Sequence, residues 1–245
     1  MNEQFSRSQL ILGKENIDKI CNLQVAVFGI GGVGGYVCEA LARTGVKNFL
    51  LVDNDTISLT NVNRQIIANL DTLGKYKTEV MKERILSINK DANVEIRNTF
   101  FLPENENEFD FTKYDYIVDA VDTVSAKISL IVKAYKEGTK IISAMGAGNK
   151  INPTLLEVTD IYKTKVDPLA KVMRNELKKR RIPKLKVVYS KEKPLKPVEG
   201  LTEELKQGKR ALPGSCMFVP SAMGIIIASE IIKDVTGIYN EDIGG

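Results

Sequence analysis

The sequence predicts an α/β protein with a Rossmann-like, mostly parallel, doubly wound sheet, followed by a C-terminal extension of antiparallel strands and helices. Up to about residue 150, short apolar runs alternate with helical patterns, as they do in βα units. The apolar runs show no polar alternation, which is typical of strands buried on both faces. A glycine-rich turn follows the first run and opens a helix, the arrangement used to bind dinucleotides.

The elements of the first part follow in order along the chain. Strands are expected over 25–30, 49–52, 94–97, 115–120 and 140–144, and helices over 33–44, 74–88 and 124–137. In the second helix an i, i+4 stripe joins Lys77 to apolar residues that would face the sheet. The third helix ends at Gly138, a residue suited to the left-handed conformation that often follows a helix.

The pattern changes after Pro153. A strand is expected over 154–159, and Asp167 and Pro168 have the sequence of a helix N-cap followed by its first position. This helix ends before Pro183, and its apolar face consists of Leu169, Val172, Met173 and Leu177. A strand over 185–189, a long loop over 191–214 and an apolar helix from Ser221 complete the chain. We expect a nucleotide-binding part over 1–150 and a C-terminal part over 151–245 that continues the same domain.

Composition excludes several classes of chemistry. The 245 residues include no histidine, so Ser-His-Asp, Cys-His and HExxH mechanisms are impossible. The three cysteines are widely spaced without a CxxC pair, which argues against structural zinc and a disulfide framework. No N-terminal signal pattern is present, and the apolar stretch over 224–232 is too short to span a bilayer. We expect a soluble, cytoplasmic protein without stable membrane insertion.

The net charge of +4 is unevenly distributed. Residues 171–196 contain eleven Lys and Arg against two Glu, a local charge of +9, so the rest of the chain sums to −5. Such a segment is a candidate contact for a polyanion, nucleic acid first and an anionic membrane second. A solvated, lysine-rich helix explains the charge equally well. The candidate RNA contacts are Arg174, Lys178, Lys179, Arg180, Arg181 and Lys184.

The glycine-rich turn predicts a nucleotide site. Its sequence, GIGGVG, places glycines at Gly29, Gly31, Gly32 and Gly34. In this motif glycines allow a tight turn, close approach of the backbone to phosphate, and close packing of helix on strand. Asp53 ends the second strand, where an acid can accept hydrogen bonds from ribose hydroxyls. The alternative is a glycine-rich packing turn.

The residues after Asp53 favour a triphosphate over a nicotinamide cofactor. Arg64 lies in the segment NVNRQ, and Lys77 begins the next helix, so two cations are available for phosphate. Asp122 follows the fourth strand and could hold Mg²⁺ against those phosphates. The alternatives are that Arg64 and Lys77 are surface charges and that Asp122 caps the following helix.

Several motifs together resemble a known enzyme superfamily. GIGGVG, LVDND, NVNRQ, Lys77 and DAVDT resemble the adenylating enzymes that include ubiquitin-activating enzymes and the activators of thiamine and molybdopterin sulfur carriers. Within that superfamily, FSRSQLILG, ALARTGV, EVTDIYKTKVDPLAKVMRNELKKR and FVPSAMG resemble the tRNA threonylcarbamoyladenosine dehydratase branch. The first resemblance covers about 150 residues, and the second covers nearly the whole chain.

The resemblance implies ATP and Mg²⁺ as ligands and assigns roles to residues. Asp53 would bind ribose, Asn61, Arg64 and Lys77 would contact phosphates, and Asp122 would organise Mg²⁺. An N-terminal arginine, for which Arg7 is the nearest candidate, would act across a homodimer. The full ATP-binding set is Gly29, Gly31, Gly32, Gly34, Asp53, Asp55, Asn61, Asn63, Arg64, Gln65, Lys77 and Asp122.

One cysteine lies just before the predicted last helix. Cys216 resembles the family's cysteine before the last helix, where a sulfur-transfer partner could dock, although an incidental thiol is the alternative. The CxxC pairs of the sulfur-carrier activators are absent, so no zinc is expected.

The activity that the resemblance implies is ATP-dependent dehydration of threonylcarbamoyladenosine in tRNA through an acyl-adenylate. Three alternatives stay open at this point. They are adenylation of the C-terminus of a ubiquitin-like sulfur carrier, an NAD-dependent oxidoreductase, and a binding module without catalysis.

Overall fold

The structure, a computed structural model, describes residues 3–198 and 213–238. Most of the loop predicted over 191–214 therefore lies outside the described residues. Residues 191–198 form no helix or strand. Among the described residues, no helix combines the length and the apolar character needed to cross a membrane.

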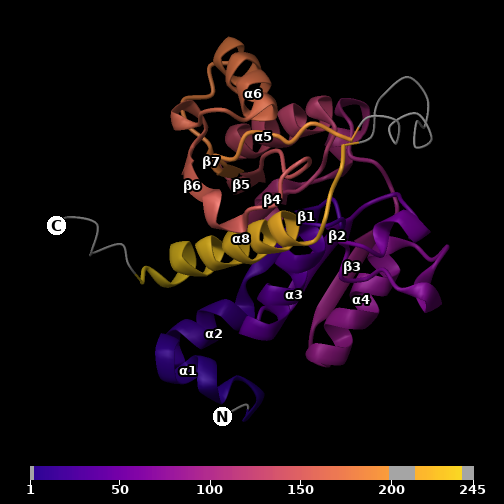
Figure 1. Cartoon of the computed structure of the whole chain (residues 1–245). Coiled ribbons are helices and arrows are strands. Elements are labelled where there is room, and N and C mark those ends of the chain that lie inside the picture. The colour runs from indigo at the N-terminus through magenta and orange to yellow at the C-terminus, as the bar shows by residue number, and fades with distance from the viewer. Residues whose placement is uncertain (1–2, 199–212, 239–245) are drawn as a thin grey trace.

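A single seven-stranded sheet forms the centre of the molecule (Figure 1). The strand order is β3-β2-β1-β4-β5-β7-β6, and every neighbouring pair is parallel except β6 and β7. The strands are β1 (Gln24–Phe28), β2 (Asn48–Val52), β3 (Asn93–Arg97), β4 (Tyr116–Asp119), β5 (Lys140–Ala144), β6 (Leu156–Asp160) and β7 (Lys186–Ser190). This order confirms the predicted fold class.

Helices cover both faces of the sheet. One face packs against α2 (Lys14–Asn22), α3 (Gly34–Thr44), α4 (Lys77–Ile88) and α8 (Phe218–Thr236). The other packs against α5 (Val124–Glu137) and α6 (Pro168–Lys179), which lie together on that side in Figure 1. Val25 and Val27 of β1 face the first layer, and Ala26 and Phe28 face the second, because side chains alternate along a strand.

Several features of the structure differ from the sequence prediction. Helix α4 begins at Lys77, three residues after its predicted start at residue 74. Two N-terminal helices, α1 (Ser6–Leu12) and α2, were not predicted. The C-terminal extension contributes β7 as a parallel neighbour of β5, and only β6 runs antiparallel. The last helix begins at Phe218, three residues before Ser221. Val172 is 44% exposed, because the buried stripe of α6 consists of Ala170, Met173 and Leu177.

The last helix packs tightly on α3, the helix that follows the glycine-rich turn. At Gly224 of α8, a Cβ atom would overlap the carbonyl oxygen of Val33 and lie 2.8 Å from Cβ of Tyr36. Pro220 of the same helix lies 3.3 Å from the position of a Cβ at Gly32. Helix α8 therefore supports the glycine-rich turn directly.

Both halves of the chain contribute to one sheet. β6 and β7 come from the part after residue 150 and continue the sheet beyond β5. The predicted division into parts over 1–150 and 151–245 stays a prediction.

Candidate nucleotide-binding site

The glycine-rich turn connects the carboxyl end of β1 to the first turn of α3. Gly29 has a φ of +88°, and a Cβ there would lie 2.6 Å from the carbonyl oxygen of Ala120. A side chain at this position would be both strained and blocked by backbone. The turn thus rests against the segment that follows β4, and the amino end of α3 faces the opening beyond the strands.

Asp53 holds this turn in place. Its carboxylate accepts hydrogen bonds from the backbone amides of Ile30, at 2.6 Å, and Asp55, at 2.8 Å. Burial raises the pKa of the Asp53 carboxyl above its ordinary value, an effect that the nearby Lys77 ammonium and the two amide bonds oppose. The carboxylate lies at the crevice beyond the strands, where open α/β sheets bind ligands.

Lys77 and Asp55 form the second element of the site. Lys77 Nζ lies 2.6 Å from Asp55 Oδ2, with the lysine side chain 7% and the aspartate side chain 53% exposed. The backbone amide of Lys77 also donates to the Asp55 carbonyl oxygen at 3.1 Å. Lys77 is therefore a largely buried cation beside Asp53 and not a solvated surface charge.

The NVNRQ segment packs against the glycines. Arg64 Cγ lies 3.6 Å from the Cβ position at Gly32, and Gln65 Nε2 lies 3.8 Å from that at Gly31. Burial lowers the pKa of the Arg64 guanidinium, which donates to the Thr60 carbonyl oxygen at 2.8 Å. Within the described residues, Gln65 Oε1 is buried without a hydrogen-bond partner. A buried acceptor left unpaired beside the turn is suited to a donor on a bound molecule.

The two asparagines of the segment have structural partners. The Asn61 carboxamide oxygen accepts from the Ser58 backbone amide at 3.0 Å. Asn63 Nδ2 donates to the Ser215 carbonyl oxygen at 2.8 Å, which joins the nucleotide-binding half to the segment before α8.

Asp122 follows β4 on the other side of the turn. Its side chain is exposed, and the Thr123 hydroxyl donates to it at 3.3 Å. The N-cap of α5 is Thr123 and not Asp122, so the capping alternative is wrong. The described residues offer Asp122 no ion pair, and no three acidic or cysteine side chains among them cluster as a metal site. One free carboxylate beside phosphates is the donor set that Mg²⁺ commonly uses, so Asp122 fits a nucleotide-bound Mg²⁺.

Arg7 lies away from this site within its own chain. It is exposed on α1, close in sequence to Phe5, whose ring lies 3.8 Å from the Cβ position at Gly45. Gly45 follows the carboxyl end of α3, whereas the glycine turn lies at its amino end. The eleven residues of α3 separate the two ends by about 16 Å.

Cys216 lies beside the loop that follows β5. It is half-buried, and its Sγ lies 4.0 Å from the Lys150 carbonyl oxygen. The neighbouring Gly214 donates its backbone amide to Asn149 Oδ1 and accepts from the Asn149 backbone amide, both at 2.7 Å. The segment before α8 is thereby attached to the loop after β5.

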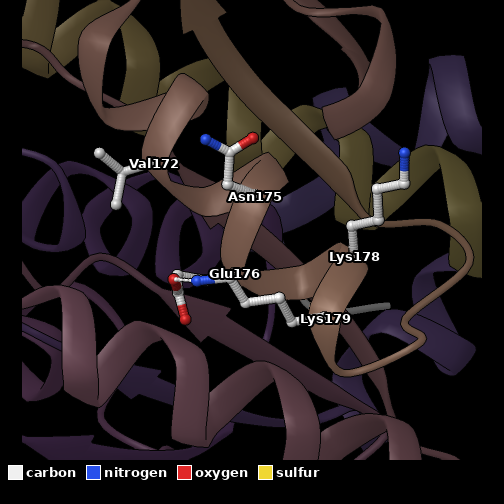
Figure 2. Close-up of a pocket in the computed structure, with 5 residues that line it drawn as sticks. All are labelled: Val172, Asn175, Glu176, Lys178 and Lys179. Atoms are coloured by element: carbon white, nitrogen blue, oxygen red, sulfur yellow. Dashed lines mark hydrogen bonds and ion pairs between the residues drawn. The ribbon is translucent and has the colours of Figure 1, made fainter.

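The candidate RNA contacts fall into two groups on and after α6. Lys178, Arg181 and Lys184 are exposed and form no ion pair with the residues that the structure describes. Arg174 instead donates to the Thr164 carbonyl oxygen at 3.0 Å, and Glu176 pairs with both Lys179, at 2.7 Å, and Arg180, at 2.6 Å. Figure 2 shows Lys179 beside Glu176, with Lys178 pointing away, at a depression of about 550 Å³.

Two buried ion pairs were not predicted. Lys127 and Asp119, both fully buried, lie 2.9 Å apart, and Lys150 and Asp167 lie 2.6 Å apart. Their partners are 8 and 17 residues apart in sequence, and only the packing of α5 and of α6 onto the sheet brings them together. An apolar sequence pattern with isolated lysines and aspartates carries no signal for such pairs.

Comparison with known proteins finds relatives in both sequence and structure. The ThiF family matches residues 4–244. The chain is 41% identical over 242 residues to tRNA threonylcarbamoyladenosine dehydratase of Bacillus subtilis (strain 168), covering 96% of this chain and 95% of that protein. It is also similar to the crystal structure of E. coli tRNA N6-threonylcarbamoyladenosine dehydratase, TcdA, in complex with ATP, with 32% identity, a TM-score of 0.87 and coverage of 98% and 96%. The chain belongs to the ThiF family.

Proposed function

We propose that the protein is an ATP-dependent enzyme that dehydrates threonylcarbamoyladenosine in tRNA. The observation that carries the choice of substrate is its 41% identity, over nearly the whole of both chains, with the B. subtilis protein of that name. The likeness to a structure that contains ATP supports the nucleotide. Adenylation of a sulfur carrier has no such support among the relatives described above.

The reaction has two steps. An oxygen of the threonyl carboxylate attacks the α-phosphorus of ATP, and pyrophosphate leaves. The carbamoyl group of the same nucleoside then attacks the activated carbonyl and loses a proton, AMP leaves, and a ring closes with net removal of water. Because both reacting groups belong to one nucleoside, proximity supplies an effective molarity on the order of 10⁵ M or more. No protein nucleophile is needed, in keeping with a chain that has no histidine.

The residues around the glycine turn would supply positioning and positive charge. Asp53 would accept hydrogen bonds from the ribose, while Arg64 and Lys77 would stabilise the negative charge that develops on the phosphates. Asp122 would hold Mg²⁺, which neutralises phosphate charge when bound. The side-chain oxygen of Gln65, which has no hydrogen-bond partner among the described residues, would accept a hydrogen bond from the same molecule.

Other contributions come from outside this crevice. Arg7 lies at the far end of α3, so it could reach a nucleotide only as Arg7 of the partner subunit in a homodimer. The basic residues on and after α6 would contact tRNA phosphates, and the reaction would take place in the cytoplasm. Cys216 is available to a sulfur-transfer partner.

A direct test is mass analysis of tRNA nucleosides after incubation with ATP and Mg²⁺. We expect threonylcarbamoyladenosine to lose one water. Lys77→Met should lower turnover by about 10²-fold or more, because a preorganised cation beside the reacting phosphates is removed. Lys75→Met is the matched control, since Lys75 is an exposed lysine two residues earlier, and it should retain activity. Unchanged nucleoside mass with the native protein would refute the proposal.

A further inference from the structure

A buried ion network lies beneath the loop that carries Asp122. Lys127 of α5 and Asp119 of β4 pair at 2.9 Å with no exposed side-chain surface on either residue. The second carboxylate oxygen of Asp119 accepts from the hydroxyl of Ser143 on the neighbouring strand β5. Lys127 Nζ makes one further bond, at 3.0 Å, to the carbonyl oxygen of Val121. The network thus connects two strand ends, the first turn of α5 and the loop between β4 and α5.

Stability is a weak explanation for this arrangement. Transferring two charges from water to the interior is costly, and packed apolar residues in place of a buried pair are often as stable or more stable. A fully hydrogen-bonded polar network does, however, fix a single arrangement of the groups that it joins. Here the backbone group fixed by the ammonium is the Val121 carbonyl.

The fixed backbone has two neighbours that belong to the nucleotide site. Val121 directly precedes Asp122, whose exposed carboxylate fits Mg²⁺. The carbonyl oxygen of Ala120 lies 2.6 Å, and the amide nitrogen of Val121 3.0 Å, from the Cβ position at Gly29. A displacement of residues 120–122 would therefore move the Asp122 carboxylate relative to the glycine turn.

We propose that Lys127, held by Asp119 and Ser143, is a positioning residue for Asp122. By its hydrogen bond to the Val121 carbonyl, Lys127 sets the distance between the Asp122 carboxylate and the glycine turn. That distance determines whether Asp122 can bind Mg²⁺ while the turn binds the phosphates. Lys127 itself touches neither. This inference rests on the proposed function, because the role of Asp122 toward Mg²⁺ is part of that proposal.

The test is the dependence of ATP binding on Mg²⁺ in the full-length protein. The variant Asp119→Asn/Lys127→Met removes both charges and the bond to Val121 while keeping side chains of similar size. Binding of a fluorescent ATP analogue is titrated with Mg²⁺ and, separately, measured in EDTA. We expect the half-saturating Mg²⁺ concentration to rise about tenfold, as when groups that orient a metal ligand are removed. Affinity in EDTA should be unchanged.

The second buried pair provides a matched control. Lys150→Met/Asp167→Asn removes a lysine and an aspartate that are equally buried, and asparagine can still cap α6 in place of Asp167. Its Mg²⁺ dependence should match that of the native protein. An Asp119→Asn/Lys127→Met protein that behaves like this control, or that loses affinity equally with and without Mg²⁺, would overturn the inference.

Asp122→Asn separates the inference from the function on which it rests. It should raise the half-saturating Mg²⁺ concentration at least as much as the double variant does. No effect of Asp122→Asn would refute both the metal role of Asp122 and the inference. An effect of Asp122→Asn without one in the double variant would refute the inference alone. Should circular dichroism show the double variant unfolded, Ser143→Ala replaces it: a smaller rise supports the inference, and no rise overturns it.

Discussion

The Asp53 side chain accepts hydrogen bonds with both carboxylate oxygens while it is largely removed from water. Burial raises the pKa of its carboxyl, and the Lys77 ammonium opposes that shift. An aspartate with a raised folded pKa takes up its proton at a higher pH than an exposed one, whose pKa is about 3.9. Protonation at this residue relieves the cost of a buried charge, so the fold gains stability from it as the pH falls.

We therefore expect ATP affinity to fall as the pH is lowered, and the fall to begin at a higher pH than an exposed aspartate would give. Protonation places a hydrogen on one Asp53 oxygen, which becomes a poorer acceptor, so the ribose loses a hydrogen-bond partner. Asp53→Asn should bind ATP weakly at neutral pH and show little of this acid dependence. The measurement is the dissociation constant of ATP at several pH values for both proteins. Parallel pH profiles would show that another group is responsible.

At this scale, local motifs were predictable and long-range partners were not. Gly29 and Asp53 could be assigned because a turn and the end of a strand are each encoded by a few neighbouring residues. The bond from Asn63 to the Ser215 carbonyl joins residues 152 positions apart, and no local pattern reports it. Lys127 and Asp119 are eight residues apart, but they meet only because α5 packs over the end of β4.

Within α6, one acidic side chain pairs with two of the basic residues that are candidate RNA contacts. The Glu176 carboxylate pairs with Lys179 and Arg180, and these hydrogen bonds lower the pKa of Glu176, so it remains charged well into acid. An RNA phosphate that approaches these cations must replace the carboxylate.

Glu176→Gln should consequently strengthen tRNA binding. Releasing the two cations should steepen the slope of log affinity against log salt concentration by about 0.7 to 0.9 for each additional phosphate that they neutralise. Filter binding at several salt concentrations measures both quantities. Glu15→Gln is the control, because Glu15 forms a similar exposed pair with Lys19 on α2. An unchanged slope would indicate that α6 does not face the tRNA.

Among the helices and strands, the bounds were predicted best where a residue that ends a helix is present in the sequence. Helix α5 and strand β5 have the predicted bounds, because Gly138, with a φ of +72°, ends the helix sharply between them. Helix α1 escaped prediction because it has only seven residues and buries none of them, so it leaves no apolar stripe. Val172 was predicted on the buried face of α6 because it is apolar. The buried stripe is narrower than the predicted one, and Val172 lies outside it.

In the whole molecule, the contact between α3 and α8 joins the helix that follows the glycine-rich turn to the last helix of the described chain. Gly224→Ala should destabilise the fold, because the added methyl overlaps backbone and the cost of overpacking, about 1–3 kcal/mol, exceeds the roughly 1 kcal/mol that alanine gains in a helix. Urea denaturation measures the change. Ile225→Ala, at an exposed neighbour, should change stability by no more than about 0.5 kcal/mol. Equal effects of the two substitutions would contradict this account.

The fold class was predictable at this scale, whereas the strand order was not. The alternation of strands and helices up to residue 150 leaves little choice beyond a doubly wound sheet. The positions of β6 and β7 depend on which edge of the sheet they join. Both strands are short, and neither sequence indicates which strand lies beside it. In the structure, α6 packs against β7, and α8 packs against both strands.

The support that α8 gives to the glycine turn also affects when the nucleotide site can form during synthesis of the chain. The turn at Gly29–Gly34 is synthesised early, yet the helix behind it, with Pro220 against Gly32, comes about 200 residues later. At roughly 5–20 residues per second, a ribosome needs about 10 to 40 s to make that stretch. During this interval the nascent chain has the nucleotide motif without its backing, so the enzyme should acquire its ligand only after the last helix has left the ribosome.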